Sequence, residues 1–376
     1  MKKKKTIFVG MSGGVDSSVS ATILKDQGHD VVGVFIRTWH PDFLVCNEED
    51  ERRDAMRVAA HLDIPFLTFD LADVYKKEVA DYMIAEYKIG RTPNPDVMCN
   101  KEVKFGAFLK KALEMGADYV ATGHYAQVQK VPQKKNFAAL PASGLRHGRN
   151  FSFAELFKGV DPSKDQCYFL WTLKQEQLKH ILFPVGHLNK TAVRKLAKKF
   201  KLPVAEKKDS QGICFLGDID LKDFLKHYIK EKKGKVINEK GEEIGFHDGA
   251  VFLTLGERHG FTITKKGPND GAYYVVAKDI KKNTITVSSN NILVSENKNI
   301  SSSYKLKNIN WVSNIPDENK KYTAQVRYHG EFLSCRIKCQ KSDVGEVIFE
   351  KQILVAPGQS VVLYDKEICL GGGVII

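Results

Sequence analysis

Short apolar runs alternate with amphipathic segments through the first third of the chain. Four of these runs have the length of buried strands and predict strands at 6–10, 31–36, 65–70 and 119–122. Between them, apolar residues recur every three or four positions and predict helices at 17–27, 48–62, 73–90 and 104–115. Strands joined by helices imply right-handed crossovers, so we predict an α/β fold with a parallel sheet covered on both faces.

The pattern changes twice further along the chain. Residues 129–157 are polar and rich in proline, glycine and basic residues, which predicts a loop-like segment. Helical spacing returns at 173–181 and 191–200. From about residue 235, short β-rich runs predict two antiparallel β modules with a linker near 292–303. The runs cover 250–255, 272–277, 284–288, 323–328, 332–337, 346–349 and 360–364.

The composition of the 376 residues is that of a globular protein, because 43% are hydrophobic and 27% charged, which excludes a disordered chain. No apolar run approaches the ~18 residues of a membrane helix. The basic N-terminus lacks the ~7–15-residue apolar stretch of a secretory signal. We therefore expect a soluble cytoplasmic protein with no membrane partner.

The chain is strongly basic, since 58 Lys and Arg residues against 45 Asp and Glu residues give a net charge of +13. Such a surplus favours a polyanionic partner such as nucleic acid, because each phosphate contact releases counterions. A lysine-rich surface that only keeps the protein in solution is the alternative.

The seven cysteines are an odd number in what we expect to be a reducing compartment, so no structural disulfide framework is predicted. No CxxC pair occurs. Cys335 and Cys339 lie four apart without a second pair or a histidine cluster, so no zinc site is predicted. Five cysteines are interpreted as structural or incidental: Cys46, Cys167, Cys335, Cys339 and Cys369.

A glycine- and serine-rich segment, SGGVDSS at 12–18, follows the first predicted strand and opens the first predicted helix. Glycines let the backbone turn tightly, and the amides of the loop and helix N-terminus then face an anion. The spacing is neither that of a Walker loop nor G-x-G-x-x-G. The segment predicts a cradle for nucleotide phosphates. A plain glycine-rich turn with Asp16 as helix cap is the alternative.

Residues 90–105 read GRTPNPDVMCNKEVKF, and the prolines predict a stiff loop that presents Asn94, Asp96 and Cys99 just ahead of a helix. A thiol near a helix N-terminus, close to Lys101 and Lys104, is expected to have a lowered pKa and to be nucleophilic. A small buried side chain is the alternative for this cysteine.

A second cysteine has similar surroundings. Residues 209–217 read DSQGICFLG, which predicts that Cys214 lies in a turn between two glycines, after the basic pair Lys207 and Lys208. The same buried alternative applies to it. Because 115 positions separate the two cysteines, the sequence alone leaves open whether they meet.

Several motifs together carry a family resemblance. SGGVDSS resembles the pyrophosphate loop of the N-type ATP pyrophosphatases, a class that includes several synthetases and tRNA-thiolating enzymes. Nearly the whole chain is similar to the bacterial tRNA-specific 2-thiouridylases, with the motifs in the same order. These motifs are PNPDVMCNKEVKF, ATGHYA (121–126), KDQCYFL (164–170), FPVGHL (183–188), KKDSQGICFLG (207–217) and CLGGGVI (369–375).

The resemblance implies a three-domain architecture and an activity. The domains are an adenine nucleotide alpha hydrolase-like ATP pyrophosphatase domain at 1–220, a small central β domain at 221–290 and a C-terminal β-barrel at 291–376. ATP with Mg²⁺ adenylates the C2 oxygen of the wobble uridine in tRNAs for Lys, Glu and Gln. Sulfur from a cysteine persulfide then replaces that oxygen, giving 2-thiouridine, AMP and pyrophosphate.

The resemblance also implies roles for single residues. Cys214 carries the persulfide, Cys99 is the nucleophile that ends in a catalytic disulfide with Cys214, and Asp96 is the general base. The target base contacts Asn94, Pro95 and Asp96. ATP contacts are expected at Gly10, Met11, Ser12, Gly13, Gly14, Val15, Asp16, Ser17, Ile36 and Gly123. Contacts with tRNA are expected at His124, Lys164, Asp165, Gln166, Arg327, Tyr328 and Gln359.

Each of these residues has a purely structural alternative. Asp96 could cap a helix, and His124 could be a packed strand-end histidine. Residues 164–166 could form a solvated turn, residues 327–328 could face outward from a strand, and Gln359 could be a turn residue. Two stretches depart from the family pattern: 129–157 is longer than expected, and 255–260 reads LGERHG where LGQRKG is common.

The expected partners are tRNA and a sulfur-relay protein or cysteine desulfurase, and the chain is expected to be a monomer. No metal site is predicted beyond the Mg²⁺ that accompanies ATP. One rival function is a tRNA thiolase of the same superfamily that acts on another base and carries a CxxC pair. Another is a catalytically inactive RNA-binding module, which the presence of Asp96, Cys99 and Cys214 disfavours.

Overall fold

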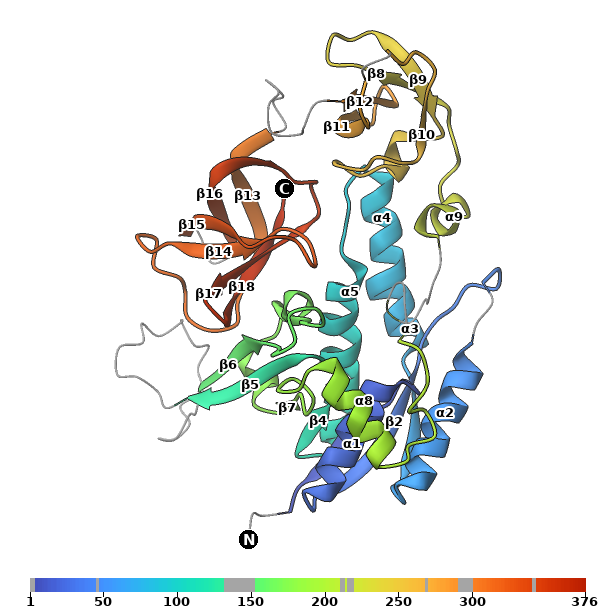
Figure 1. Ribbon diagram of the computed structural model, residues 1–376, viewed down its shortest axis with the longest axis vertical. Helices are drawn as coiled ribbons and strands as arrows, with labels where there is room; N and C mark the ends of the chain where they lie inside the picture. Colours follow the sequence, from blue (N-terminus) through green and yellow to red (C-terminus); the bar gives the residue numbers. More distant parts are fainter. Residues whose placement is uncertain are drawn as a thin grey trace.

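The structure is a computed structural model of the chain, and it describes residues 4–44, 47–131, 153–209, 214, 220–267, 270–289, 300–339 and 343–376. Figure 1 shows three separate bodies. The first body contains the N-terminal sheet and its helices, and the other two are the C-terminal barrel and the central β domain. Cys46, most of the expected 129–157 loop and most of the expected 292–303 linker lie outside the described residues.

A five-stranded parallel sheet forms the centre of the first body, as the alternating pattern predicts. Its strand order is β3-β2-β1-β4-β7, so β2 and β3 lie on one side of β1 and β4 and β7 lie on the other. The strands are β1 (Thr6–Gly10), β2 (Asp30–Arg37), β3 (Phe66–Asp70), β4 (Tyr119–Ala121) and β7 (Ile181–Leu182). In such sheets ligands bind beyond the carboxyl ends of the strands where the order reverses, here between β1 and β4.

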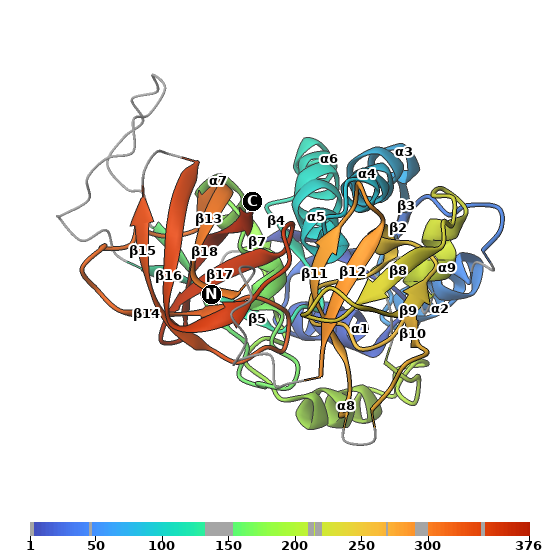
Figure 2. The ribbon, with the colours of Figure 1, turned by 90° about the horizontal axis from the view of Figure 1, so that it is seen from above.

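Helices cover both faces of this sheet, and each face has its own apolar core. One face packs against α1 (Val15–Asp26), α2 (Glu48–His61) and α8 (Lys190–Lys199). The other packs against two longer helical segments, which lie across the strands from α8 when the molecule is seen from above (Figure 2). The predicted α/β class is therefore confirmed.

The two longer segments contain wide π-helical turns. The first comprises α3 (Ala72–Tyr75), η1 (Lys76–Asp81) and α4 (Tyr82–Lys88) and ends before Gly90, as predicted. The second comprises α5 (Pro95–Met98), η2 (Cys99–Phe108) and α6 (Leu109–Glu114). The prediction that this helix begins at residue 104 was wrong, because Asn94 caps it and Pro95 occupies its first position.

The segment between the sheet and the β domains contains more regular structure than predicted. β5 (Ala126–Val131) and β6 (Phe153–Lys158) pair as an antiparallel hairpin, so the ends of the 129–157 stretch are strands rather than loop. The predicted helix at 173–181 is shorter. Helix is confined to η3 (Cys167–Leu170) and α7 (Gln175–Leu178), because residues 181–182 pair with β4.

The next helix is α9 (Leu221–Lys226), whose buried Phe224 and Leu225 belong to the apolar core of the first body. The central domain that follows has a five-stranded sheet in the order β10-β9-β8-β12-β11. Its strands are β8 (Gly234–Ile237), β9 (Glu243–His247), β10 (Phe261–Ile263), β11 (Tyr274–Asp279) and β12 (Thr284–Ser288). The predicted strand at 250–255 is instead the short helix η4 (Ala250–Phe252). Gly249, at φ 155°, turns the chain, and its carbonyl accepts from the Phe252 N–H.

The C-terminal body is a closed barrel, which removes free strand edges. Its strands are β13 (Ile300–Trp311), β14 (Tyr322–Gln325), β15 (Leu333–Cys339), β16 (Val344–Leu354), β17 (Ser360–Asp365) and β18 (Ile368–Ile375). They close in the order β13-β16-β15-β14-β17-β18, and β18 pairs again with β13. β13 already begins at residue 300, inside the expected linker. β6 also pairs with β18, so the hairpin fixes the barrel to the first body.

The glycine run at 371–373 is explained by this closure. A Cβ atom on Gly371 would collide with the Asn310 carbonyl oxygen on β13, and one on Gly372 would collide with the Val361 carbonyl on β17. The motif CLGGGVI is therefore a packing requirement of the barrel. Within the described parts of the chain, none of the helices combines the length and the hydropathy needed to cross a bilayer.

Replacing Gly371 by alanine is expected to destabilise the protein. The residue has φ 130° and a neighbouring backbone in the way, so we expect a loss of about 2–4 kcal/mol in the free energy of unfolding. Urea denaturation followed by circular dichroism measures it. The control is Gly28→Ala, where φ is 83° but no atom lies within 4 Å, and the expected loss is about 1 kcal/mol. Equal losses in the two variants would contradict the packing explanation.

Candidate active site

The glycine loop lies at the carboxyl end of β1, where the sheet order reverses. Gly13 has φ 70°, and a Cβ atom there would collide with the Glu51 carbonyl oxygen of α2. The Ser17 hydroxyl accepts from the Ser12 N–H at 3.3 Å, and the Ser18 hydroxyl donates to the Gly14 carbonyl at 2.7 Å. Hydrogen bonds within the loop thus stabilise it, and no side chain caps the N-terminus of α1.

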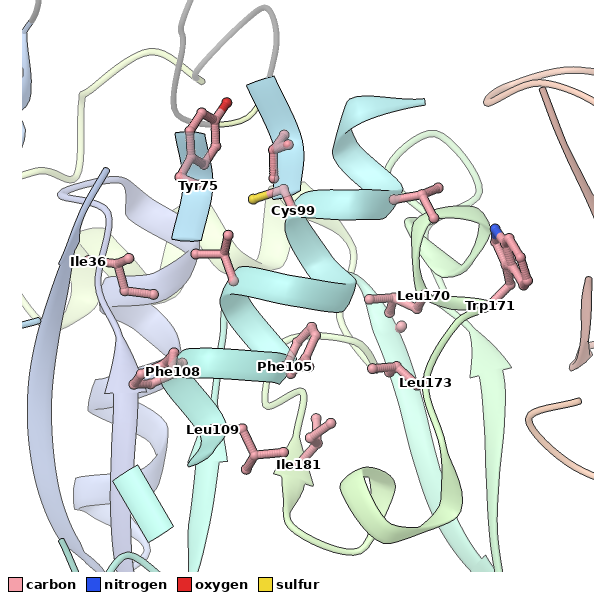
Figure 3. Close-up of a cluster of buried hydrophobic side chains, with 14 of the residues drawn as sticks. Ile36, Tyr75, Cys99, Phe105, Phe108, Leu109, Leu170, Trp171, Leu173 and Ile181 are labelled. Carbon is pink, nitrogen blue, oxygen red and sulfur yellow. The ribbon is translucent and has the colours of Figure 1, made fainter. Parts of the chain in front are cut away.

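Other residues expected to contact ATP lie along the same edge. Gly123 follows β4, and a Cβ atom there would come within 2.6 Å of the Ser17 N–H. Its lack of a side chain therefore lets the chain after β4 pass close to the start of α1. Ile36 is buried near the end of β2 (Figure 3), and the Met11 N–H donates to the Val34 carbonyl at 2.8 Å.

Asp16 takes part in an ion network and is not a helix cap. Its carboxylate accepts from the Tyr125 hydroxyl at 2.8 Å and from the Lys190 ammonium at 2.7 Å. Lys190 also forms an ion pair with Asp209 at 2.8 Å, and Asp209 forms a second ion pair with Arg194 at 2.5 Å. Partial burial opposes ionisation of Asp209, but hydrogen bonds from its lysine partners hold its pKa well below the usual value.

Sequence reasoning missed Tyr125, Lys190, Arg194 and Asp209 as members of this network. Lys190 and Arg194 are four residues apart on α8, a spacing that equally suits an exposed charged face, and Lys190 lies one residue before the predicted helix at 191–200. Asp209 stands inside the motif KKDSQGICFLG, so its position there was the one available signal.

The two cysteines meet. The sulfurs of Cys99 and Cys214 lie 3.5 Å apart, as free thiols rather than a disulfide. The Cys214 N–H donates to Asp96 Oδ1 at 2.9 Å, and the Tyr75 hydroxyl donates to the Cys214 carbonyl at 2.8 Å. Tyr75 and Cys99 come from neighbouring helical segments and face each other (Figure 3). The glycines expected on either side of Cys214 lie outside the described residues.

The thiol chemistry differs from the prediction. Cys99 was expected to have a lowered pKa, but burial and its hydrogen bond to Cys214 raise that pKa well above the usual value. The reason is its position, one turn inside a helix and 0% exposed, rather than in a loop before one. The hydrogen bond from Cys99 and the charge of Lys104 lower the pKa of Cys214 to about 7, despite burial.

Asn94 and Asp96 lie in the first turn of the same helix. Asn94 is the N-cap, and its side-chain oxygen accepts from the Val97 N–H at 3.1 Å. Asp96 therefore does not serve as the cap, which was its structural alternative. Burial raises the pKa of the Asp96 carboxyl, and the hydrogen bond from Cys214 offsets this in part. A carboxyl with a raised pKa beside two thiols is suited to accept a proton near neutral pH.

The first group of expected tRNA contacts is engaged within the protein. His124 is 6% exposed, lies between Phe105 and Phe183, and shares a hydrogen bond of 2.6 Å with Thr122. Burial lowers the pKa of His124 well below its usual value, so the ring is neutral. The packed-histidine alternative describes its position here.

Residues 164–166 are not a solvated turn. Lys164 pairs with Asp209 at 2.8 Å, and Asp165 accepts from the Gly159 and Cys167 N–H groups at 2.9 and 3.1 Å. The Gln166 side chain accepts from the Tyr125 N–H at 3.1 Å. All three side chains therefore have partners within the protein, and Gln166 fixes the chain just after Gly123.

The second group lies at the junction of the barrel with the first body. Arg327 and Tyr328 lie in the turn after β14, not in a strand, and Arg327 is exposed. The Tyr328 ring packs 4.3 Å from that of Phe169. Gln359 Nε2 donates to the Thr92 carbonyl at 2.9 Å, while the Thr92 N–H donates to the Pro357 carbonyl at 2.8 Å.

The fold and the loop define an N-type ATP pyrophosphatase (HUP) domain followed by two β domains. Residues 5–218 match the family model described as tRNA methyl transferase HUP domain. Residues 222–289 match the tRNA methyl transferase PRC-barrel domain, and residues 301–375 match the Aminomethyltransferase beta-barrel domain.

Curated relatives match over almost the whole chain. The tRNA-specific 2-thiouridylase MnmA of Streptococcus thermophilus is 42% identical, covering 99% of this chain and 95% of its own. That of Listeria monocytogenes is 42% identical, covering 98% and 94%. The chain therefore belongs to the tRNA-specific 2-thiouridylase family, and the resemblance found in the sequence is confirmed.

Solved structures are more distant. The U34-tRNA thiolase NcsA of Methanococcus maripaludis is 14% identical, with 61% of this chain and 68% of that chain covered and a TM-score of 0.35. This likeness adds nothing to the assignment. No group of three or more His, Cys, Asp or Glu side chains that could hold a metal ion occurs among the described residues.

Mild oxidation is expected to link Cys99 to Cys214. A bond of about 2.05 Å requires each sulfur to move by less than ~1 Å from the 3.5 Å contact. Diamide treatment followed by peptide mass spectrometry under non-reducing conditions checks this. The linked peptide should vanish in Cys99→Ser and persist in Cys339→Ser. Finding Cys214 bridged mainly to another cysteine would contradict the observed pairing.

Proposed function

We propose that this chain is an ATP-dependent tRNA-uridine 2-sulfurtransferase that makes 2-thiouridine at the wobble position. The observation that carries the proposal is the 3.5 Å contact between Cys99 and Cys214 beside the Asp96 carboxyl. The family models speak of methyl transfer, whereas the curated relatives are named 2-thiouridylases. Two thiols and a buried carboxyl are the groups that a sulfur transfer uses, which favours thiolation.

The first step is activation by ATP. The loop Gly10–Ser17, with Ile36 and Gly123 along the same edge, binds the nucleotide, and Mg²⁺ accompanies its phosphates. The amides at the start of α1 stabilise the negative charge of the phosphates. Transfer of AMP to the C2 oxygen of uridine releases pyrophosphate and turns that oxygen into a good leaving group.

The second step is sulfur transfer. The Cys214 thiolate takes a sulfane sulfur from a sulfur-relay protein or cysteine desulfurase and becomes a persulfide. Its terminal sulfur attacks C2, and AMP leaves. Cys99, losing its proton to Asp96, then attacks the Cys214 sulfur and forms the Cys99–Cys214 disulfide. The electron pair of the broken sulfur–sulfur bond stays with the new 2-thiouridine, and an external thiol reduces the disulfide afterwards.

The target base must reach these groups. A base inside the anticodon stack is extruded at a cost of a few kcal/mol. Asn94, Pro95 and Asp96 form the start of the helical segment α5–η2–α6, which we call the catalytic helix. We assign to these three residues the contacts to the extruded uridine. The proposed substrates are the tRNAs for Lys, Glu and Gln, each modified at its wobble uridine.

The remaining contacts to tRNA are assigned to residues of the first body and of the C-terminal barrel. They are His124, Lys164, Asp165, Gln166, Arg327, Tyr328 and Gln359. The net charge of +13 supports docking of the tRNA backbone. We divide the chain into a catalytic domain at 1–220, a central β domain at 221–290 and a barrel at 291–376, acting as a monomer in the cytoplasm.

A reconstituted reaction tests this function. Unmodified tRNA, ATP, Mg²⁺ and a cysteine desulfurase with its cysteine are incubated with the protein. Nucleoside mass spectrometry should show 2-thiouridine at the wobble position, with AMP and pyrophosphate formed. Cys99→Ser and Cys214→Ser should each lower the rate by at least about a hundredfold, because each removes a reacting sulfur.

The control is Cys339→Ser in the barrel, which should keep the wild-type rate. Formation of ADP would contradict the assigned role of the loop. Normal thiolation by either active-site variant would contradict the cysteine roles. Thiolation of a different base would identify the protein as another thiolase of the superfamily.

A further inference from the structure

A thiolate at Cys214 is a negative charge on a half-buried side chain, and it needs a positive partner. The hydrogen bonds from Cys99 and Tyr75 bring no positive charge to this cluster, and the Asp96 carboxyl adds a second acidic group. Burying an anion without a cation is costly. The side chain that supplies the positive charge is Lys104.

Lys104 lies on the same helical segment as Cys99, five residues further on and within the π-helical turns of η2. Backbone hydrogen bonds of a π-helix join residues i and i+5, so these two side chains leave the helix near one another. Because the Cys99 sulfur lies 3.5 Å from that of Cys214, a side chain that leaves the helix beside Cys99 can reach both sulfurs. A hydrogen bond and the charge of the Lys104 ammonium act on Cys214, and the same charge acts on Cys99 and Asp96. A short π-helical stretch is frequent at functional sites, and here it aligns a lysine with two thiols.

The charge balance agrees with this placement. Burial alone would lower the pKa of Lys104, but the charges of Cys214 and Cys99 and the hydrogen bond to Cys214 outweigh it and raise the pKa. Lys104 also faces His124, whose ring burial keeps neutral, so no second cation competes for the thiolate from that side.

Lys101 provides the contrast on the same helix. The sequence favoured both lysines as neighbours of Cys99. In the structure the Lys101 side chain is 45% exposed and pairs with Glu102 at 2.8 Å. Of these two lysines, Lys104 is therefore the one whose charge acts on the sulfurs. It favours the anionic form of both thiols, but burial outweighs it at Cys99 and not at Cys214.

We propose that Lys104 is a catalytic residue whose ammonium binds the reactive sulfur on Cys214 and holds it as an anion. Its action on the resting thiolate is independent of the function proposed above, and its action on the persulfide rests on that function. The terminal persulfide sulfur carries the same negative charge one bond further out, within reach of a flexible lysine. Lys104 keeps its proton throughout and contributes only charge and a hydrogen bond.

The experiment measures the rate at which iodoacetamide alkylates Cys214 between pH 5 and 10, resolved by peptide mass spectrometry. The wild-type midpoint is expected near pH 7. In Lys104→Met the thiolate loses its cation, so the midpoint should rise by about one unit and the rate at pH 7 should fall about tenfold. Lys104→Arg, which keeps the charge, should stay within about twofold of wild type.

The matched control is Lys101→Met, which should leave the profile unchanged. Lys104→Gln removes the charge but keeps a hydrogen-bond donor, and it replaces Lys104→Met if that variant does not fold. A profile unchanged in a folded, uncharged variant, or shifted equally by Lys101→Met, would overturn the proposal. If the profile shifts as expected but the wild type thiolates no tRNA, the lysine assignment stands and the proposed function fails.

Discussion

The active site depends on one hydrogen bond between segments that are distant in the sequence: the Asp96 carboxylate accepts the backbone N–H of Cys214. A bond of this charge-assisted kind contributes about 1.5–3 kcal/mol. Together with the Tyr75 hydroxyl on the Cys214 carbonyl, it fixes both backbone groups of that residue. The 3.5 Å contact with Cys99 follows from this placement, and so does the access of Lys104 to the same sulfur.

The nucleotide loop and the sulfur site are joined by a second set of contacts. Lys190 bridges Asp16, in the first turn of α1, and Asp209, five residues before Cys214. A residue of the glycine loop and the segment that leads to Cys214 therefore share one lysine. This link fixes the glycine loop and the segment before Cys214 relative to each other.

The barrel contributes to this site from a distance. Both backbone polar groups of Thr92 are bound by the turn before β17, through Pro357 and Gln359. Two residues later Asn94 caps the catalytic helix. Gly358, at φ 95°, lets this turn approach closely, since a Cβ atom there would lie 2.8 Å from the Thr92 carbonyl. The start of the catalytic helix is thus positioned by the C-terminal domain as well as by its own cap.

Local patterns in the sequence determined the elements, because periodicity and glycine placement act over a few residues. The parallel sheet and the place of the glycine loop after its first strand were predicted this way, whereas the nucleotide-binding role of the loop and the reactivity of Cys99 and Cys214 stay predictions. Tertiary structure alone decided the rest. The helix starts at Pro95 rather than at residue 104, so Cys99 is buried and its pKa rises, while the pKa of Cys214 falls. A thiol's acidity depends on burial and on neighbours brought from elsewhere in the chain, such as a sulfur 115 positions away. No local pattern records those neighbours.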